Sequence, residues 1–276
     1  MIRVGIQGSH GTFSEIAAVR YFAGTEAERI GYPNFPAIMK ELDSHQLDYA
    51  VLPVENTTTG IISRTYDLFQ YHDIHAVGEV LVPIKENLIV IPGTKLEDIR
   101  HVYSHPEALS QCQHFFAEHP ACHPVTYQDT SKSVEFVRNS GDKSNAALAS
   151  YLAAEYYGMS SLLENVNDST LNMTRFLVVT WRHESLPEAD KTSLMLVLKH
   201  EPGSLYRALA ELADAHIDMV KLESRPLPGR IFEYMFYVDI IGNEQDPHIH
   251  AALEALAAHC VTLRSFGSYK AADKPE

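Results

Sequence analysis

The chain has few cysteines, no excess of positive charge and no long apolar run. Its 3 cysteines are scattered and odd in number, which argues against a disulfide framework and indicates a reducing compartment. No segment approaches the roughly 18 consecutive apolar residues that a membrane span requires. The N-terminus lacks the basic segment and apolar stretch of a signal peptide. We therefore expect a cytoplasmic protein that does not enter the membrane.

The net charge indicates which partners the chain does not bind, and the pattern of histidines bears on metal binding. The chain has 22 Lys and Arg residues against 36 Asp and Glu residues, so its formal net charge is -14. Because Lys and Arg supply most of the affinity for nucleic acids and anionic membranes, neither is an expected partner. The 15 histidines lack a matching framework of cysteines or carboxylates. We expect no metal and no cofactor.

The order of predicted elements divides the chain into two regions. Residues 1–181 alternate short β-rich runs with helical patterns, which indicates parallel sheets with helices on both faces. Residues 182–190 are polar, contain a proline and lack periodicity, so they are predicted to form a linker. Residues 191–276 follow the order β-α-β-β-α-β of a ferredoxin-like domain. The predicted fold class is therefore α/β with a smaller second domain.

The first polar segment, Gly5 to Glu15, joins a predicted strand to a predicted helix. Its glycines have the spacing G-x-x-G-x-x-G, and Thr12 or Ser14 either caps a tight turn or helps to bind an anion. This spacing differs from the dinucleotide motif G-x-G-x-x-G, so we do not expect a nicotinamide cofactor.

Two further segments repeat this layout. Glu55 and Asn56 follow a predicted strand, where they either cap a helix or face a ligand beyond the sheet edge. Ser104 also ends a predicted strand and is a predicted N-cap, with Gln111 two turns further along.

The most informative segment is residues 172–176, Asn-Met-Thr-Arg-Phe, which precede an apolar run. The segment places the hydroxyl of Thr174, the guanidinium of Arg175 and the ring of Phe176 at the edge of a predicted buried strand. Polar groups in such a place must find partners or cost free energy. This segment therefore predicts a functional site better than any cluster of surface charges.

Two short segments of the second region have the composition of an amino-acid site. Residues 201–205 connect a predicted strand to a helix, and residues 223–226 end another strand. A turn and a polar strand end would explain both segments. Alternatively, the backbone amides near Gly203 hold the carboxylate of an amino acid.

Taken together and in this order, six motifs resemble those of the prephenate dehydratase family, and the resemblance covers nearly the whole chain. The motifs are Gly11–Glu15, Pro53–Asn56, Ser104–Pro106 with Gln111 and Cys112, Thr174–Phe176, Pro202–Leu205 and Glu223–Pro226. Thr57 stands where the family more often has serine, and Ser9-His10 replaces a pair that more often contains proline. No chorismate mutase segment precedes Met1, so the chain resembles the monofunctional form.

The resemblance implies an architecture. The catalytic domain, residues 1–181, would have two lobes like a type II periplasmic binding protein, with the chain crossing between them near residues 75–80 and 165–172. Residues 191–276 would form an ACT regulatory domain. Because such domains bind phenylalanine between subunits, we expect a homodimer or a homotetramer.

The resemblance also implies the reaction, in which prephenate loses water and carbon dioxide to give phenylpyruvate for L-phenylalanine biosynthesis. Arogenate, which carries an amino group on its side chain, is an alternative substrate. A non-catalytic solute-binding or sensing protein on the same scaffold is another reading.

Site residues follow from the family motifs. Thr174 would donate the proton to the leaving hydroxyl. The expected substrate-binding residues are Thr12, Ser14, Glu55, Asn56, Ser104, Gln111, Arg175 and Phe176. Arg175 would either bind the pyruvyl carboxylate or organise Glu55. The expected site for allosteric phenylalanine comprises Pro202, Gly203, Ser204, Leu205, Glu223, Ser224, Arg225 and Pro226.

Overall fold

The computed structural model describes residues 1–184 and 186–273. The chain divides into two compact units, one formed by Met1–Asp73 and Val80–Leu177 and the other by Ile74–Glu79 and Val178–Glu276. No helix in the described ranges has the length and apolar character that crossing a bilayer requires.

The first sheet has the strand order β2-β1-β3-β11-β5, and β4 pairs with β3. Strand β1 pairs in parallel with both β2 and β3, as the alternating pattern predicts. The strands are β1 (Ile2–Gln7), β2 (Ala27–Tyr32), β3 (Tyr49–Asn56), β4 (Gly60–Ile61), β5 (His75–Pro83) and β11 (Met173–Thr180). The helices that follow its strands are α1 (Phe13–Tyr21), α2 (Phe35–Asp43) and α3 (Ser63–Phe69).

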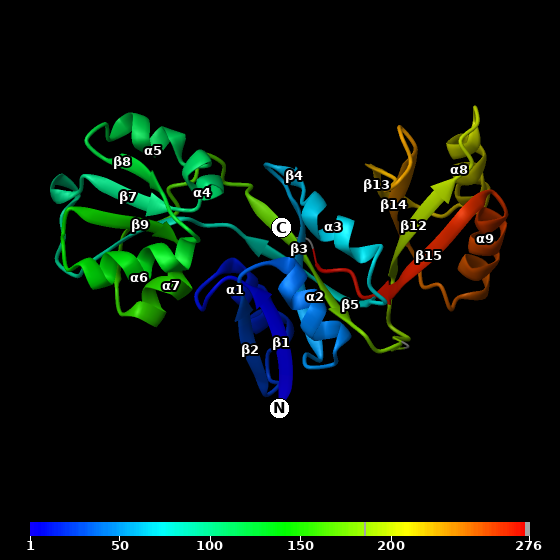
Figure 1. Ribbon diagram of the computed structural model, residues 1–276, viewed down its shortest axis with the longest axis horizontal. Coiled ribbons are helices and arrows are strands. Elements are labelled where there is room, and N and C mark those ends of the chain that lie inside the picture. Colours follow the sequence, from blue (N-terminus) through cyan, green and yellow to red (C-terminus); the bar gives the residue numbers. More distant parts are fainter. Residues whose placement is uncertain (185, 274–276) are drawn as a thin grey trace. The chain divides into compact units, whose positions relative to one another are not determined.

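The second sheet has the strand order β10-β6-β9-β7-β8 and is mixed (Figure 1). Its parallel part is β8-β7-β9, whereas β6 runs antiparallel to β9 and to β10. The strands are β6 (Asn87–Val90), β7 (His101–Ser104), β8 (His123–Thr126), β9 (Asn145–Ala149) and β10 (Ser160–Leu163). The helices are η1 (Leu96–Asp98), α4 (Pro106–Ser110), α5 (Gln113–Glu118), α6 (Thr130–Ser140) and α7 (Tyr151–Tyr157).

Apolar clusters cover both faces of this second sheet. Leu88, Val102 and Leu148 pack with Phe115 of α5 on one face, while Ile89 and the α6 and α7 side chains form a cluster on the other. Buried contacts on both faces explain why these strands read as continuous apolar runs in the sequence.

The chain crosses from the first sheet to the second at residues 84–86 and returns at residues 164–172. The return agrees with the predicted crossing near 165–172. The predicted crossing near 75–80 is wrong, because the run of buried residues continues through Val82 and keeps residues 75–83 in strand β5. Both crossings lie within the first unit and matter for the site, since they carry polar groups to it.

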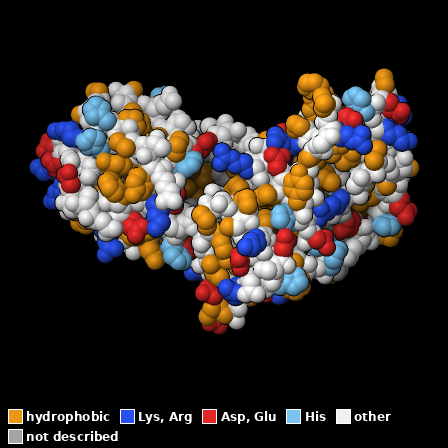
Figure 2. Space-filling model, in the orientation of Figure 1, with side chains coloured by type: hydrophobic (Ala, Val, Ile, Leu, Met, Phe, Trp, Pro, Cys, Tyr) orange, Lys and Arg blue, Asp and Glu red, His pale blue; other side chains and the backbone are white. Residues whose placement is uncertain are grey.

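The second unit has the predicted order β-α-β-β-α-β, in an antiparallel sheet with the strand order β13-β14-β12-β15. Its elements are β12 (Lys191–Leu198), α8 (Ser204–Asp214), β13 (Met219–Pro226), β14 (Tyr234–Ile241), α9 (Pro247–Ala258) and β15 (Cys260–Tyr269). Helices α8 and α9 share one apolar core with the sheet, which includes Leu194, Leu196, Leu212 and Leu253. Exposed apolar side chains gather at the tip of the β13–β14 connection in Figure 2, where Ile231 and Phe232 are exposed.

The sequence pattern misplaced two boundaries of this unit. The β-rich run from Ile231 to Ile241 predicts a strand, but β14 begins at Tyr234, since Phe232 has a positive φ of 56° that a regular strand does not allow. The predicted linker 182–190 belongs to the second unit, apart from Ser185, which lies outside the described residues. Asp190 accepts a hydrogen bond from the backbone N–H of Ala271 at 2.7 Å, and this contact holds the segment against the end of β15.

Candidate active site

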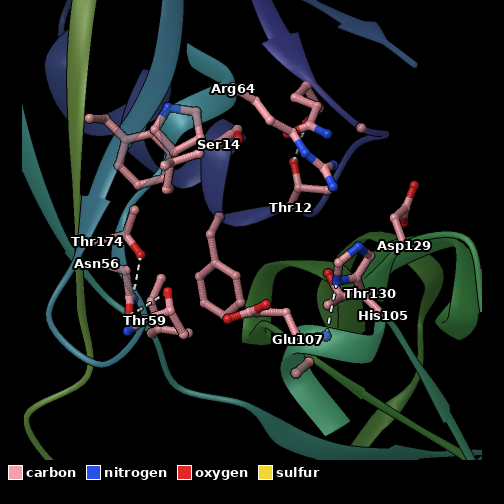
Figure 3. A pocket seen from close by; sticks show the side chains of 18 of the residues that line it. Thr12, Ser14, Asn56, Thr59, Arg64, His105, Glu107, Asp129, Thr130 and Thr174 are labelled. Carbon is pink, nitrogen blue, oxygen red and sulfur yellow. Dashed lines mark hydrogen bonds between the residues drawn. The ribbon is translucent and has the colours of Figure 1, made fainter. Parts of the chain in front are cut away.

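A cavity of about 500 Å³ lies within the first unit. This volume is in the range of small-molecule sites. Figure 3 shows Asn56, Thr59 and Thr174 on one side of the cavity and groups from α4 and the start of α6 on the other. The lining residues are Gln7, Gly8, Thr12, Phe13, Ser14, Phe35, Pro53, Asn56, Thr59, Ile61, Ile62, Ser63, Arg64, Ile84, Glu86, His105, Glu107, Ala108, Gln111, Asp129, Thr130, Thr174 and Phe176.

Thr174 lies near the start of β11 and is only 7% exposed. Asn56, at the end of β3, donates a hydrogen bond from Nδ2 to the Thr174 hydroxyl at 2.9 Å. The orientation of Asn56 is determined, because its Oδ1 accepts the backbone N–H groups of Thr58 and Thr59 at 2.8 and 3.0 Å. Since Asn56 supplies the donor, the hydrogen of Thr174 is left to donate into the cavity.

A chain of buried amides extends from Thr174 to Gln111. Nδ2 of Asn56 also donates to Oδ1 of Asn172 at 2.8 Å, and Nδ2 of Asn172 donates to Oε1 of Gln111 at 2.7 Å. Each amide orients the next, so the Nε2 donors of Gln111 are the groups that this chain presents to a ligand. Sequence reasoning did not select Asn172, although it is the first residue of the most informative segment.

The loop before α1 is organised by a buried carboxylate. Thr12 stands at the N-cap position, but its hydroxyl donates to the backbone oxygen of Ser9 at 3.0 Å and makes no cap. Glu15 instead accepts the N–H of Gly11 at 2.6 Å. Burial raises the pKa of Glu15, and the hydrogen bond from Gly11, with help from His10 and Arg29, outweighs it and lowers that pKa overall. The side chains of Thr12 and Ser14 line the cavity.

Gly11 itself could not be replaced without a clash. Its φ is +87°, and an added Cβ would lie 2.6 Å from the backbone of Ala153 in α7. Together with the bond to Glu15, this contact means that the amide of Gly11 holds the loop in place and is not available to a bound anion.

Three predicted site residues lie outside the cavity lining. Arg175 is buried on β11, with Nη1 3.7 Å from Oε2 of Glu55 on β3. Of the two roles predicted for Arg175, this geometry favours the organisation of Glu55. The hydroxyl of Ser104 donates to the backbone oxygen of Leu148 at 2.7 Å, which links β7 to β9.

The predicted N-cap at Ser104 is wrong, because its hydroxyl makes this bond to Leu148 instead. Ser104 is the last residue of β7, and α4 is capped by His105, whose Nδ1 accepts the N–H of Glu107 at 3.2 Å. Gln111 stands immediately after α4 and does not lie two turns inside a longer helix.

Charged groups in the lining were not selected from the sequence. Arg64 is exposed on α3, and it has no ion-pair partner among the described residues. Glu86 comes from the crossing between the sheets, and Asp129 is the N-cap of α6. These side chains stand in ordinary helix or loop contexts, so no local pattern distinguishes them from surface charges.

The second unit has a smaller cavity of about 150 Å³. Ser204 and Leu205 of the first predicted phenylalanine motif line it, together with Tyr234 and Phe236 of β14. Gly203 has a φ of +81° at the start of α8, a conformation that favours glycine. The second motif, residues 223–226, lies on the edge strand β13 in register with residues 234–237 of β14.

Known proteins resemble this chain over nearly its whole length. The family model described as prephenate dehydratase matches residues 4–184. Arogenate dehydratase/prephenate dehydratase 1, chloroplastic, of Arabidopsis thaliana is 35% identical over 285 residues, which cover 97% of this chain and 72% of that protein.

Two solved structures resemble the present one closely. The prephenate dehydratase of Arthrobacter aurescens in complex with L-Phe has a TM-score of 0.88 at 30% identity, covering 98% of this chain and 90% of that one. A structure described as GqqA, a novel type of quorum quenching acylase, has a TM-score of 0.88 at 30% identity, covering 98% of both chains. The family model and the sequence relative agree, and the chain belongs to the prephenate dehydratase family.

Proposed function

We propose that the protein converts prephenate to phenylpyruvate, with loss of water and carbon dioxide, in L-phenylalanine biosynthesis. The observation that carries this proposal is the Thr174 hydroxyl, which is buried at the cavity wall and held by Asn56 with its hydrogen left to donate. The reaction belongs to the carbon–oxygen lyases, since a C–O bond breaks without hydrolysis.

The departing ring hydroxyl needs a proton donor. A threonine hydroxyl is a poor acid, so we assign Thr174 a hydrogen bond that becomes a proton transfer only as the C–O bond breaks. Formation of the aromatic ring drives the reaction. Orientation of the substrate and fixed dipoles, such as the amide of Asn56, then supply much of the acceleration.

The substrate is a dianion, and the described residues of the cavity lining offer it the cation of Arg64 and several neutral donors. We assign Arg64, the exposed cation of the lining, to attract a carboxylate at the entrance. Ser14 and Gln111 supply neutral donors, Thr12 lines the wall beside them, and Phe176 supplies an apolar wall for the ring. The carboxylate that leaves as carbon dioxide is best bound by neutral groups, because a cation would hold the charge that must flow into the ring.

Replacement of Thr174 tests this assignment. We expect Thr174→Ala to fold normally and to lose roughly 10²–10⁴-fold in turnover, because only one small proton-donating group is removed. Phenylpyruvate formation from prephenate is the measurement. Thr58→Ala, a matched change at an exposed threonine outside the cavity lining, is the control. Near-normal turnover of the Thr174 variant would remove this residue from the mechanism.

Incubation with alternative substrates tests the reaction itself. Arogenate is compared with prephenate, because the Arabidopsis relative is named for both activities. Binding of prephenate without product would instead identify a sensing or solute-binding protein. Because a similar structure is described as an acylase, release of an acyl group without any phenylpyruvate would replace the dehydratase proposal.

We also propose that the second unit is an ACT domain that binds L-phenylalanine and regulates the enzyme. Support comes from its β-α-β-β-α-β order and from the small cavity at the start of α8. The site would comprise Pro202, Gly203, Ser204, Leu205, Glu223, Ser224, Arg225 and Pro226. Calorimetry of the intact protein with L-phenylalanine checks this, and the absence of binding would reject it.

We further propose a cytoplasmic homodimer or homotetramer. Strand β13 is an edge strand that carries one of the two phenylalanine motifs, so a second subunit could complete the effector site there. Light scattering with and without L-phenylalanine gives the subunit number, and a monomer under both conditions would contradict the proposal.

A further inference from the structure

Glu86 has the most unusual environment of the side chains in the cavity lining. Its backbone N–H donates to Oδ1 of Asn167 at 2.7 Å, and its backbone oxygen accepts the N–H of Val166 at 2.8 Å. Glu86 lies in the first chain crossing, and these two bonds fix its backbone to the second crossing. Its exposure is 2%, and Oε2 is fully buried with no hydrogen-bond partner in the described part of the chain.

A carboxyl group in such a place keeps its proton. Burial without a compensating hydrogen bond or cation disfavours the ionised form, and it raises the pKa of Glu86 to about 8. At neutral pH the side chain is therefore a carboxylic acid with an O–H to donate, and not an acceptor only.

The groups around Glu86 do nothing to reverse this. Burial also raises the pKa of the Cys112 thiol, which therefore stays neutral. The Asp168 carboxylate accepts the backbone N–H groups of Gln113 and His114, at 2.9 and 2.8 Å. The other titratable or charged groups nearby are His114 beside Asp168, the neighbouring Lys85, and Arg64, His105, Glu107 and Asp129 of the lining. Within residues 1–184 and 186–273, no cation pairs with Glu86.

The position of Glu86 indicates which part of a ligand it meets. The N–H of Asp168 donates to the backbone oxygen of Gln111 at 2.8 Å, and the adjacent Asn167 binds Glu86. Glu86 is therefore close to the Gln111 end of the amide chain, whereas Thr174 lies at the opposite end of that chain. In prephenate the ring hydroxyl and the carboxylates occupy opposite ends of the ring. A hydroxyl beside Thr174 directs the carboxylates toward Gln111 and Glu86.

We propose that Glu86 is a substrate-binding residue, which donates its carboxyl O–H to a carboxylate of the bound dianion beside the Nε2 donors of Gln111. This inference rests on the proposed function of the same cavity. A neutral acid suits the task, because it adds a donor without the positive charge that would hold back decarboxylation. Binding breaks no covalent bond. Above the pH at which Glu86 ionises, a proton must first be taken up from solvent, because two carboxylates cannot share the site without it.

The dependence of kcat/KM for prephenate on pH tests this role. We expect wild-type kcat/KM to fall about tenfold per pH unit above about pH 8. The fall should come from a rise in KM and not from a fall in kcat. Glu86→Gln keeps a neutral donor, so its KM at pH 7 rises only a few-fold and the alkaline fall disappears. Glu86→Leu removes the donor, and we expect at least a tenfold rise in KM with a smaller change in kcat.

Controls separate this proposal from the proposed function. Glu118→Gln makes the same substitution at an exposed residue outside the lining and leaves the wild-type profile unchanged. The proposal is overturned if Glu86→Gln keeps the wild-type alkaline fall. It is also overturned if Glu86→Gln loses 100-fold in kcat at constant KM, since that result would assign proton transfer to Glu86. Absence of prephenate turnover by the wild-type protein would reject the proposed function instead.

Calorimetry supplies a readout that does not depend on turnover. With prephenate as the probe at pH 9, in buffers of different ionisation enthalpy and on the slow Thr174→Ala background, binding by the protein that retains Glu86 should take up close to one proton. Glu86→Gln should take up none. Equal proton uptake by the two proteins would refute the role of Glu86 even if the enzyme is active.

Discussion

Two buried glutamates of the first unit have opposite environments. Glu15 is 6% exposed, and its carboxylate accepts the N–H of Gly11 at 2.6 Å and lies near His10 and Arg29. Glu86 is 2% exposed, and its Oε2 meets no donor in the described residues. The pKa of Glu15 is lowered, whereas burial raises the pKa of Glu86 to about 8. Burial favours the neutral form at both positions, so the donors around the group decide its charge.

This difference separates a structural carboxylate from one that is available to a ligand. Glu15 uses its oxygens to fix the loop that carries Thr12 and Ser14 to the cavity. Glu86 lines the cavity, and its buried Oε2 has no hydrogen-bond partner among the described residues. Stability measurements against pH can therefore examine the two environments separately.

The largest expected effect on stability is at Glu86. Its folded-state pKa lies above the unfolded value, so the wild-type protein loses stability as the pH rises from about 4.5 through 8. The loss is up to about 5 kcal/mol, since each unit of pKa difference is worth about 1.4 kcal/mol. Glu86→Gln cannot ionise and should unfold at a higher temperature than wild type at pH 9. Calorimetric scans between pH 5 and 9 provide the measurement, and parallel curves for the two proteins would show that Glu86 is not protonated.

The opposite pH dependence is expected at Glu15. Its folded-state pKa lies below the unfolded value, so its contribution is present above about pH 4.5 and is lost as the pH falls through the folded value. Glu15→Gln should lower the free energy of unfolding at pH 7 by about 1.5–3 kcal/mol, the usual range for a hydrogen bond to a charged group. Urea unfolding at pH 7 and pH 3 measures this. A variant that is destabilised equally at both values would contradict the ionised assignment.

The smallest effect is expected at Arg29. Its Nε lies 3.3 Å from Oε1 of Glu15, but the arginine side chain is 35% exposed. Arg29→Ala should cost only about 0.2–1 kcal/mol at pH 7, and less in high salt. Urea unfolding at two salt concentrations checks this. A loss as large as that of Glu15→Gln would show that the cation, and not the amide of Gly11, keeps Glu15 ionised.

Local patterns predicted most of the secondary structure. Of the nine site residues predicted for residues 1–181, six line the cavity. Thr12, Ser14, Asn56, Gln111, Thr174 and Phe176 lie around one cavity. Thr12, Ser14 and Asn56 stand at the end of a strand or the start of a helix, where the sequence pattern itself changes. The same reasoning fails at Ser104. It also ends a strand, but its hydroxyl donates to the backbone oxygen of Leu148 on a neighbouring strand.

Residues that depend on distant contacts were not predicted. Asn172 acquires its role by binding Gln111, which lies 61 positions earlier, and Glu86 is held by Asn167, 81 positions later. No local pattern indicates that two such residues meet. The first chain crossing was misplaced for a related reason, since only the sheet shows that β5 continues to Pro83.

The sequence by itself determined the order of helices and strands, the positions of the family motifs and the β-α-β-β-α-β order of the second unit. Periodicity, turn residues and caps act over a few neighbouring residues, so they can be read directly. Tertiary structure alone decided that the amide of Asn56 orients Thr174 and that burial raises the pKa of Glu86 to about 8. Burial and hydrogen-bond partners come from segments far apart in the chain, and these determine which polar groups are engaged and which are left for a ligand.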